Sequence, residues 1–281
     1  MYRASTIHYL KSLTTRNLPA YCRNAWIKSI INRALGVIIN RQLNDITWQT
    51  VLPDMFVTRN NEVHIWRVCI SQNLKRLERF EALLTADETV RAGKYRQQKD
   101  TYRFIVSRGM QRIILGRYVN TPPAQLKFIL GENKKPCLMS QDGNTIHYNV
   151  SHAGDWIVLA VATLPVGADV EYADAAFSFQ EILADNFSRE EVAYINQDNA
   201  AHRFYTLWTR KEAILKATGQ GIGEHLSITP ALNGTHLLNA SLTGADKNWQ
   251  LRSFNLYPQY ASTVVVEDAG QDYLFFDTAS F

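Results

Sequence analysis

Cysteines, long apolar runs and an excess of one charge are all scarce in this chain of 281 residues. The three cysteines, Cys22, Cys69 and Cys137, are odd in number and lack the spacing of a metal site, which indicates free thiols in a reducing compartment and a cytoplasmic protein. No stretch approaches the roughly 20 continuous apolar residues that cross a bilayer, so no membrane span is expected. The formal net charge of +4 gives no sign of a nucleic-acid binder, although it suits an acidic partner or a polyphosphate ligand.

Glycine-based signatures of several enzyme classes are also missing. There is no Walker glycine loop and no Gly-Ser signature of a nucleotidyltransferase. Ser151 does not lie in a Gly-x-Ser-x-Gly elbow, because Asn149 stands where the first glycine is needed, which makes it a poor hydrolase nucleophile. What remains is a balance of 46% hydrophobic and 20% charged residues, which is typical of a globular protein with a sizeable core.

Acidic residues are absent from the N-terminal segment up to Asp45, whereas basic residues recur along it. This composition is typical of an organelle-import segment or a basic arm, although Trp26, Ile30 and Ile31 also have the spacing of an amphipathic helix. We assign residues 1–60 to a basic N-terminal extension. Met55, just before the first convincing strand, is a possible start of a complete domain.

The pattern of expected elements favours an α+β fold, because strands and helices alternate without regular βαβ repeats. The expected elements are strands at 63–70, 146–150, 157–170, 226–228, 250–255 and 261–267 and long helices at 99–118 and 203–218. Residues 61–165 and 166–281 have a similar plan, which predicts two halves related by a pseudo-twofold axis with a ligand cleft between them.

Two short stretches carry most of the chemistry. In the strand that contains Gly167-Ala168-Asp169-Val170-Glu171, Asp169 and Glu171 are two residues apart and face the same side. In the helix that contains Trp208 to Lys216, Glu212 and Lys216 are four apart and share a face. Three neighbouring carboxylates repel one another unless a cation lies between them, and Mg²⁺ is the natural guest. The alternative is a solvated strand end and a surface ion pair.

Two further motifs suit a phosphate ligand. Lys135-Pro136 follows Gly131 in a loop, and Ser151-His152 ends a strand. Lys135 would act as a point charge, and the Ser151 hydroxyl and the His152 ring would donate hydrogen bonds. The alternative for both motifs is ordinary loop and turn chemistry.

Taken in chain order, five motifs resemble those of the 4'-phosphopantetheinyl transferases, and in particular the monomeric type that activates nonribosomal peptide and polyketide synthetases. The motifs are Lys135-Pro136-Cys137-Leu138, Asn149-Val150-Ser151-His152, Gly167-Ala168-Asp169-Val170-Glu171, Phe187-Ser188-x-x-Glu191 and Trp208-x-x-Lys211-Glu212-Ala213-x-x-Lys216. The resemblance covers roughly Val63 to Glu267, and Met1 to Asp54 have no counterpart in it.

This resemblance implies an enzyme of two α+β halves that binds coenzyme A and Mg²⁺ between them. It implies transfer of the phosphopantetheine arm onto a serine of an acyl or peptidyl carrier protein, with 3',5'-ADP as the other product. The positions that match functional residues of the family are Asp169, Glu171 and Glu212 for the metal, Lys216 for the pyrophosphate, Ser151 and His152 for the 3'-phosphate, Lys135 and Pro136 for the nucleotide side, and Arg91 and Arg103 for the nucleotide phosphates. Glu191 matches an acidic position of the family. The proton of the attacking serine would go to a carboxylate, Glu171 or Glu212, or to a metal-bound water.

Three other interpretations remain open at this stage. The same carboxylates suit an Mg²⁺-dependent phosphohydrolase or nucleotidyltransferase that needs no carrier protein. A non-catalytic family member that only binds carrier proteins or coenzyme A would have lost a ligand carboxylate, but all three are present. The basic first segment would fit a nucleic-acid or membrane arm, although no aromatic-basic interleaving or groove motif supports this.

Overall fold

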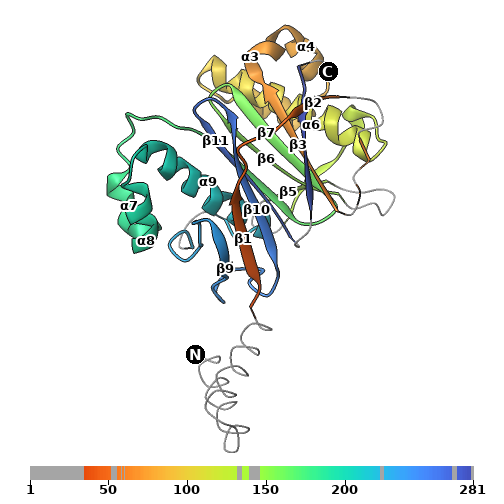
Figure 1. Cartoon of the computed structure of the whole chain (residues 1–281). Coiled ribbons are helices and arrows are strands. Elements are labelled where there is room, and N and C mark those ends of the chain that lie inside the picture. The colour runs from red at the N-terminus through yellow and green to blue at the C-terminus, as the bar shows by residue number, and fades with distance from the viewer. Residues whose placement is uncertain are drawn as a thin grey trace, which may run out of the picture.

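Two five-stranded β-sheets with helices packed against them form most of the protein (Figure 1). The computed structural model describes residues 35–51, 56–57, 59, 61–131, 135–138, 146–221, 225–267 and 271–279. Within these ranges strands and helices are mixed in an α+β fold, which confirms the fold class predicted from the sequence.

The first sheet has the strand order β2-β12-β3-β7-β6. Its strands are β2 (Trp48–Thr50), β12 (Asp272–Asp277), β3 (Glu62–Cys69), β7 (Trp156–Ala162) and β6 (His147–Ala153). β12 runs parallel to β2 and β3, whereas β7 runs antiparallel to β3 and β6. Every residue of β7 is buried, and its branched apolar side chains suit a strand that has neighbours on both sides.

The second sheet has the strand order β8-β11-β10-β1-β9. Its strands are β8 (Val166–Tyr172), β11 (Tyr260–Glu267), β10 (Trp249–Tyr257), β1 (Val37–Gln42) and β9 (Gly234–Leu237). β1 runs parallel to β10, and the other neighbours are antiparallel. A separate hairpin pairs β4 (Phe128–Leu130) with β5 (Pro136–Leu138).

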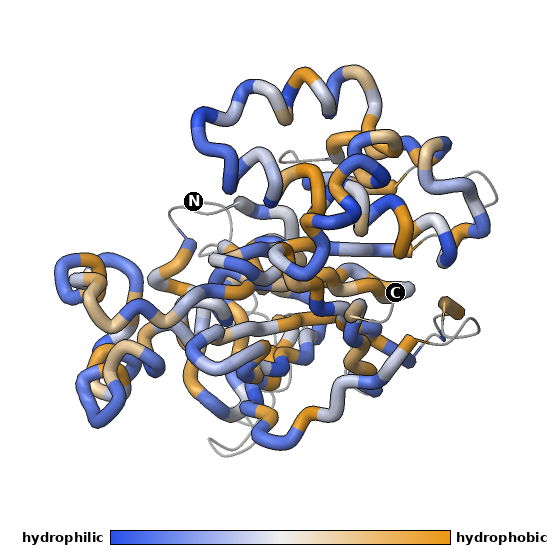
Figure 2. The backbone as a smooth tube through the Cα atoms, turned by 90° about the horizontal axis from the view of Figure 1, so that it is seen from above, coloured by the Kyte–Doolittle hydropathy of each residue, from blue (hydrophilic) through white to orange (hydrophobic). Residues whose placement is uncertain are grey.

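Helices cover the outside of both sheets. They are α3 (Ile70–Asn73), α4 (Leu77–Glu81), α5 (Ala86–Ala92), α6 (Gln98–Tyr118), α7 (Gln180–Asn186), α8 (Arg189–Ile195) and α9 (Ala200–Thr218), with 3-10 turns at Leu74–Arg76 and Pro123–Gln125. α5 and α8 each begin with a capping box, formed by Thr85 with Glu88 and by Ser188 with Glu191. Figure 2 shows hydrophilic and hydrophobic colours alternating along the outlying helical turns, as expected for helices with one face on a core.

The same unit of strand, long helix and two strands occurs twice. It consists of β3, α6, β6 and β7 in the first half and of β8, α9, β10 and β11 in the second. The strands lie in the order β6-β7-β3 in one unit and β10-β11-β8 in the other, which is the same arrangement. This repetition confirms the two similar halves predicted from the sequence.

The two sheets meet face to face around a shared apolar core. Val63, Ile65, Val158 and Ala160 of the first sheet pack with residues of β8 and β11 in the second. β6 and β8 lie next to each other, and the Asn149 side chain of β6 accepts a hydrogen bond of 2.8 Å from the backbone N–H of Ala168 in β8. The ends of both strands, which carry the candidate site residues, are thereby held side by side.

The structure differs from the sequence prediction at three places. The expected strand over 157–170 is two strands, because the chain bends at Thr163 and Leu164, just before Pro165, and passes from β7 in one sheet to β8 in the other. The expected strand at 226–228 is a series of turns, and the strand of that region is β9. Within the predicted extension 1–60, β1 and β2 contribute one strand to each sheet, whereas residues 1–34 and Met55 lie outside the described residues.

Candidate functional site

Three carboxylates come together where α9 packs against β8. Asp169 and Glu171 project from alternate positions of β8, and Glu212 projects from α9. Asp169 and Glu212 are buried, with only 1% and 6% of their surface exposed. Burial raises the pKa of both Glu171 and Glu212 to about 7, and the charge of Asp169 adds to the shift in each. The three groups therefore interact electrostatically, as the sequence predicted.

The ammonium group of Lys216 contacts this cluster. Its Nζ lies 2.5 Å from Oδ1 of Asp169 and 3.7 Å from Oε2 of Glu212, and it donates a hydrogen bond of 3.2 Å to Oγ of Ser151. The Ser151 hydroxyl in turn donates to the same oxygen of Asp169 at 2.8 Å. Burial alone would lower the pKa of Lys216, but the three carboxylates outweigh it and raise the pKa. Lys216 is thus charged and ties α9 to β6 and β8.

The donor set suits a hard cation. Oδ2 of Asp169 is buried and has no hydrogen-bond partner, so one carboxylate oxygen is left with unused capacity to accept. Mg²⁺ favours oxygen ligands, takes few protein carboxylates and fills its shell with water and phosphate. Across the described part of the chain, however, no three His, Cys, Asp or Glu side chains are arranged to hold a metal ion. The sequence predicts that the three carboxylates surround one ion, and this remains a prediction; in the structure the ammonium of Lys216 lies against Asp169 and Glu212.

A cavity of about 370 Å³ opens next to the carboxylates. Its lining includes most of the residues predicted to bind the nucleotide, namely Arg91 of α5, Arg103 of α6, Pro136 of β5, Ser151 and His152 of β6, and Lys216 of α9. Desolvation and the nearby Arg103 lower the pKa of His152, so its ring is neutral at neutral pH and has one N–H group that can donate a hydrogen bond. Four cationic side chains line the cavity, Arg91, Arg103, Arg108 and Lys216, and they favour a ligand with several phosphates.

Sequence reasoning missed part of this lining. Tyr95, Arg108 and Gln111 also face the cavity. Arg108 forms an ion pair of 3.2 Å with Glu88 and donates to the side chain of Gln111 at 3.3 Å, which fixes its position on α6. The signal was present, because Arg103, Ser107 and Gln111 are four residues apart and share one helix face.

Lys135 points elsewhere than expected. Its Nζ donates to the backbone carbonyls of Val166 and Ala217, at 3.2 and 2.9 Å, and desolvation lowers its pKa to about 8. Lys135 is not among the residues that line the cavity. Its predicted phosphate contact remains a prediction, and in this structure it links β8 to the C-terminal end of α9.

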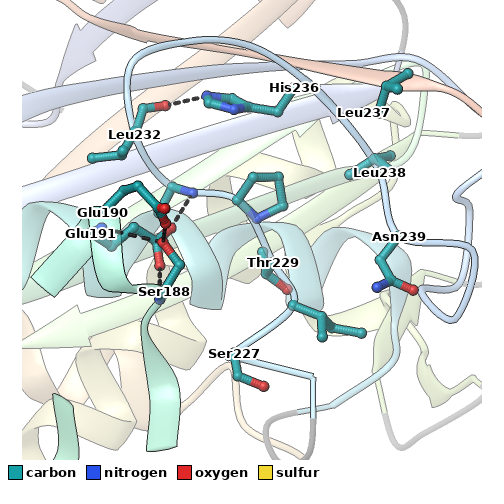
Figure 3. Close-up of a pocket in the computed structure, with 13 residues that line it drawn as sticks. Ser188, Glu190, Glu191, Ser227, Thr229, Leu232, His236, Leu237, Leu238 and Asn239 are labelled. Atoms are coloured by element: carbon teal, nitrogen blue, oxygen red, sulfur yellow. Dashed lines mark hydrogen bonds between the residues drawn. The ribbon is translucent and has the colours of Figure 1, made fainter. Parts of the chain in front are cut away.

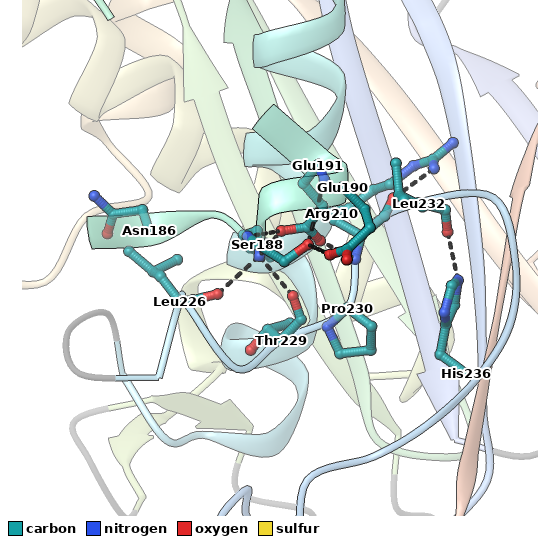
Figure 4. Close-up of polar contacts among 12 residues, drawn as sticks. Asn186, Ser188, Glu190, Glu191, Arg210, Leu226, Thr229, Pro230, Leu232 and His236 are labelled. Carbon is teal, nitrogen blue, oxygen red and sulfur yellow. Dashed lines mark hydrogen bonds and ion pairs between the residues drawn. The ribbon is translucent and has the colours of Figure 1, made fainter. Parts of the chain in front are cut away.

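Glu191 and Lys211 form a buried ion pair behind the site. Oε2 of Glu191 lies 2.8 Å from Nζ of Lys211, and Oε1 accepts a hydrogen bond of 2.7 Å from the backbone N–H of Ala231 (Figure 4). Lys211 also donates to the carbonyls of Leu226 and Thr229, at 2.8 and 2.6 Å. Both charges therefore hold the segment 226–232 against α8 and α9.

A second cavity, of about 520 Å³, lies over this segment, between α8 and the strand β9 (Figure 3). Its lining includes Glu190, Thr229, Leu232 and His236, and the ring of His236 forms a hydrogen bond of 2.8 Å with the carbonyl of Leu232. None of the residues predicted for metal, coenzyme or catalysis lines it. The chemistry predicted from the sequence thus belongs to the smaller cavity, which lies beside the carboxylates.

The fold and the site define a protein of two α+β halves with a basic cavity beside an acidic cluster. Residues 165–265 match the model of the 4'-phosphopantetheinyl transferase superfamily, and residues 70–164 match that of the 4'-phosphopantetheinyl transferase N-terminal region. The chain is 31% identical to the 4'-phosphopantetheinyl transferase HetI of Nostoc sp. over 67% of its own length and 81% of that protein. It is 24% identical to the 4'-phosphopantetheinyl transferase Sfp of Bacillus subtilis, over 66% of this chain and 84% of Sfp.

The chain therefore belongs to the 4'-phosphopantetheinyl transferase superfamily, as the order of its motifs predicted. It is an enzyme, a transferase of the 4'-phosphopantetheinyl group. No helix of the described residues is long and apolar enough to cross a membrane.

Proposed function

We propose that this enzyme transfers the 4'-phosphopantetheine arm of coenzyme A to a serine of an acyl or peptidyl carrier protein and releases 3',5'-ADP. The observation that carries the proposal is the meeting of a cavity lined by Arg91, Arg103 and Lys216 with the carboxylates of Asp169, Glu171 and Glu212. The first set suits the phosphates of coenzyme A, and the second suits a divalent cation.

The nucleotide end of coenzyme A would lie in the basic cavity. Arg91 and Arg103 supply positive charge from two different helices, and Ser151 and His152 supply hydrogen-bond donors from the end of β6. His152 is neutral, so it would recognise a phosphate by hydrogen bonding, and the arginines would supply the charge. This assignment places the diphosphate next to Lys216, at the border between the cavity and the carboxylates.

Asp169, Glu171 and Glu212 would hold Mg²⁺, as the resemblance implies. A bound Mg²⁺ neutralises charge that develops on the diphosphate during phosphoryl transfer. The unpartnered Oδ2 of Asp169 supports this role. The raised pKa values of Glu171 and Glu212 support it too, because neighbouring carboxylates that repel one another favour a cation among them.

The chemical step needs no covalent bond between the substrate and the protein. The hydroxyl of the carrier serine attacks the β-phosphorus of coenzyme A, and the bond to the oxygen of 3',5'-ADP breaks. Lys216 would stabilise the negative charge that moves to the departing oxygen. Glu171 or Glu212 would accept the serine proton, since each lies at the carboxylate cluster and has a pKa near 7.

The proposal is tested by incubating an apo carrier protein with this enzyme, coenzyme A and Mg²⁺. Mass spectrometry should show the carrier heavier by one phosphopantetheinyl group. Asp169→Ala and Glu212→Ala should each abolish the shift and leave the far-UV circular dichroism unchanged, because in either variant the remaining carboxylate still pairs with Lys216. Glu78→Ala removes an exposed carboxylate on α4 and should behave like the wild type.

Release of phosphate or pyrophosphate from coenzyme A without a carrier protein would instead favour the phosphohydrolase interpretation. Near-normal transfer by either site variant would refute the metal assignment. We also propose, first, that the protein is a monomer and, second, that it lies in the cytoplasm. The second is supported by the free thiols of Cys69 and Cys137, whereas Cys22 lies outside the described residues.

A further inference from the structure

Lys216 lies where two requirements of the proposed reaction meet. Its ammonium group contacts Asp169 at 2.5 Å and Glu212 at 3.7 Å, and both carboxylates are proposed metal ligands. The same side chain lines the cavity proposed for coenzyme A, together with Arg103 and His152. One cation therefore has access to both the carboxylates and the phosphates.

A divalent cation and the ammonium cannot share Asp169 without cost. Two cations a few ångströms apart repel each other, and the repulsion is strong where water is largely excluded. Asp169 is 1% exposed, so water screens little at this position. For Mg²⁺ to bind at Asp169, Lys216 has to give up at least part of its contact there.

Lys216 is built to change partners without leaving the site. It extends from α9 on a flexible four-carbon stem, and a quarter of its side chain is exposed, 25% against 2% for Asp169. Its other hydrogen-bond partner, the Ser151 hydroxyl, also lines the cavity. A diphosphate in the cavity would offer the ammonium new oxygen partners close to the old ones.

We propose that Lys216 is an exchangeable counter-cation, which neutralises Asp169 and Glu212 in the free enzyme and passes to the diphosphate of coenzyme A when Mg²⁺ binds. The inference rests on the proposed function and adds a form of regulation to it. Mg²⁺ binds weakly until coenzyme A offers Lys216 an alternative partner, so the two bind cooperatively. The carboxylates are thereby kept neutralised until the cosubstrate is present.

The test is calorimetric titration of the full chain with Mg²⁺, at a fixed alkaline pH, with and without coenzyme A and with no carrier protein. In the wild type, coenzyme A should raise the affinity for Mg²⁺ strongly. In Lys216→Met, the affinity for Mg²⁺ alone should rise by about tenfold, because no ammonium competes for Asp169. The further gain from coenzyme A should be smaller in this variant than in the wild type.

Two control variants separate charge from fold. Arg103→Met removes a cation that lines the cavity and pairs with Asp100, at 2.8 Å, so it should weaken coenzyme A and leave the affinity for Mg²⁺ alone unchanged. Lys216→Arg keeps the charge and should bind Mg²⁺ alone no more tightly than the wild type. Thermal unfolding checks that each variant is folded, and Lys216→Gln, which also removes the charge, replaces Lys216→Met if that variant is not folded.

An unchanged or lower affinity of Lys216→Met for Mg²⁺ alone would overturn the exchange, as would an equal gain from coenzyme A in both proteins. Either result would leave the proposed function standing if the wild type still binds Mg²⁺ and modifies a carrier protein. Absence of Mg²⁺ binding and of transfer in the wild type would instead refute the proposed function itself.

Discussion

The carboxylates of the site are held in a state that costs the folded protein free energy. Glu171 and Glu212 have pKa values of about 7, first because they are buried and then because Asp169 lies close by. Burial also raises the pKa of Asp169, although Lys216 and Ser151 oppose the shift. Such groups are unfavourable as anions until a cation joins them, which is the behaviour of a binding site for a positive charge.

The stability of the metal-free protein should therefore fall between about pH 4.5 and pH 7. A glutamate in the unfolded chain loses its proton near its ordinary pKa of 4.5, whereas Glu212 in the folded chain keeps it until about 7. As the pH rises through this window, the unfolded state is favoured, by on the order of 1 to 2 kcal/mol for one such group. Glu212→Gln should flatten the dependence of the melting temperature on pH with Mg²⁺ chelated.

The matched control is Glu78→Gln, which changes an exposed glutamate of α4. Its melting curve should keep the slope of the wild type across the same window. If Glu212→Gln and the wild type lost stability in parallel, the raised pKa of Glu212 would be wrong.

For single residues, the sequence was a better guide to which side chains belong to the site than to the contacts that each side chain makes. The period of two along β8 and of four along α9 places Asp169, Glu171, Glu212 and Lys216 at one site, as observed. Lys135 shows the limit, because its ammonium binds carbonyls of β8 and α9. A contact between a loop and the end of a distant helix depends on tertiary packing, which no local pattern encodes.

The close approach of β8 and α9 is what aligns the carboxylates, and Gly167 permits it. A methyl group on Gly167 would lie 2.1 Å from the carbonyl oxygen of Ala213 and 2.5 Å from the backbone nitrogen of Ala217. Gly167→Ala should push the helix from the strand and destabilise the protein by about 2 to 3 kcal/mol. The displacement should also reduce transfer, since Asp169 and Glu212 lie on the two separated elements.

Gly93→Ala provides the comparison for this substitution. Gly93 follows α5 with an ordinary φ of −70°, and the nearest atom to its added methyl group would lie 3.7 Å away. Chemical denaturation and the transfer assay should show this variant close to the wild type. Equal effects of the two substitutions would mean that the space at Gly167 does not govern the alignment.

The buried ion pair of Glu191 and Lys211 secures the segment 226–232. Lys211→Met leaves the carboxylate of Glu191 buried beside no cation, and it leaves the carbonyls of Leu226 and Thr229 without their donor. The loss should be about 3 to 5 kcal/mol of unfolding free energy, measured by chemical denaturation.

An exposed ion pair should respond differently. Lys247→Met breaks a pair of 2.7 Å with Glu267 in which 45% of the lysine side chain is exposed, and it should cost about 1 kcal/mol or less. A similarly small cost for Lys211→Met would show that the segment 226–232 does not depend on this pair.

At the scale of elements, hydrophobic pattern located the long helices and the strands with many apolar residues. Helix 99–118 and strand 63–70 correspond to α6 and β3 within one or two residues. β1 and β2 were missed because β1 alternates only briefly and β2 has three residues. Their place is set by partners more than 200 residues away in the sequence, β10 for β1 and β12 for β2, and such pairings leave no local signature.

In the whole molecule, each end of the described chain adds a strand to the sheet of the opposite half. β1, near the start, lies between β10 and β9 in the second sheet, and β12, near the end, lies between β2 and β3 in the first (Figure 1). Each sheet is therefore completed by a strand that is distant in sequence from the rest. The two halves have the same order of connected strands and helix, but they are not independent folding units. Each sheet contains a strand from the opposite end of the chain, β12 in the first sheet and β1 in the second.

This arrangement allows a test of whether the fold needs the residues before Met55. A chain that begins at Met55 lacks β1 and β2, and with β1 it loses Ile38, which is fully buried among Leu215, Trp249 and other residues of the core under α9. It also leaves β10 without its parallel neighbour over five residue pairs, from Ile38 with Trp249 to Gln42 with Ser253.

We expect this shortened chain to lose cooperative thermal unfolding and transfer activity, whereas a chain that begins at Leu35 keeps every described strand and should retain both. The physical reason is that a sheet without its inner strand has unpaired backbone groups and an exposed core. A chain from Met55 that melts cooperatively at the wild-type temperature would instead show that β1 and β2 are dispensable additions to the two halves.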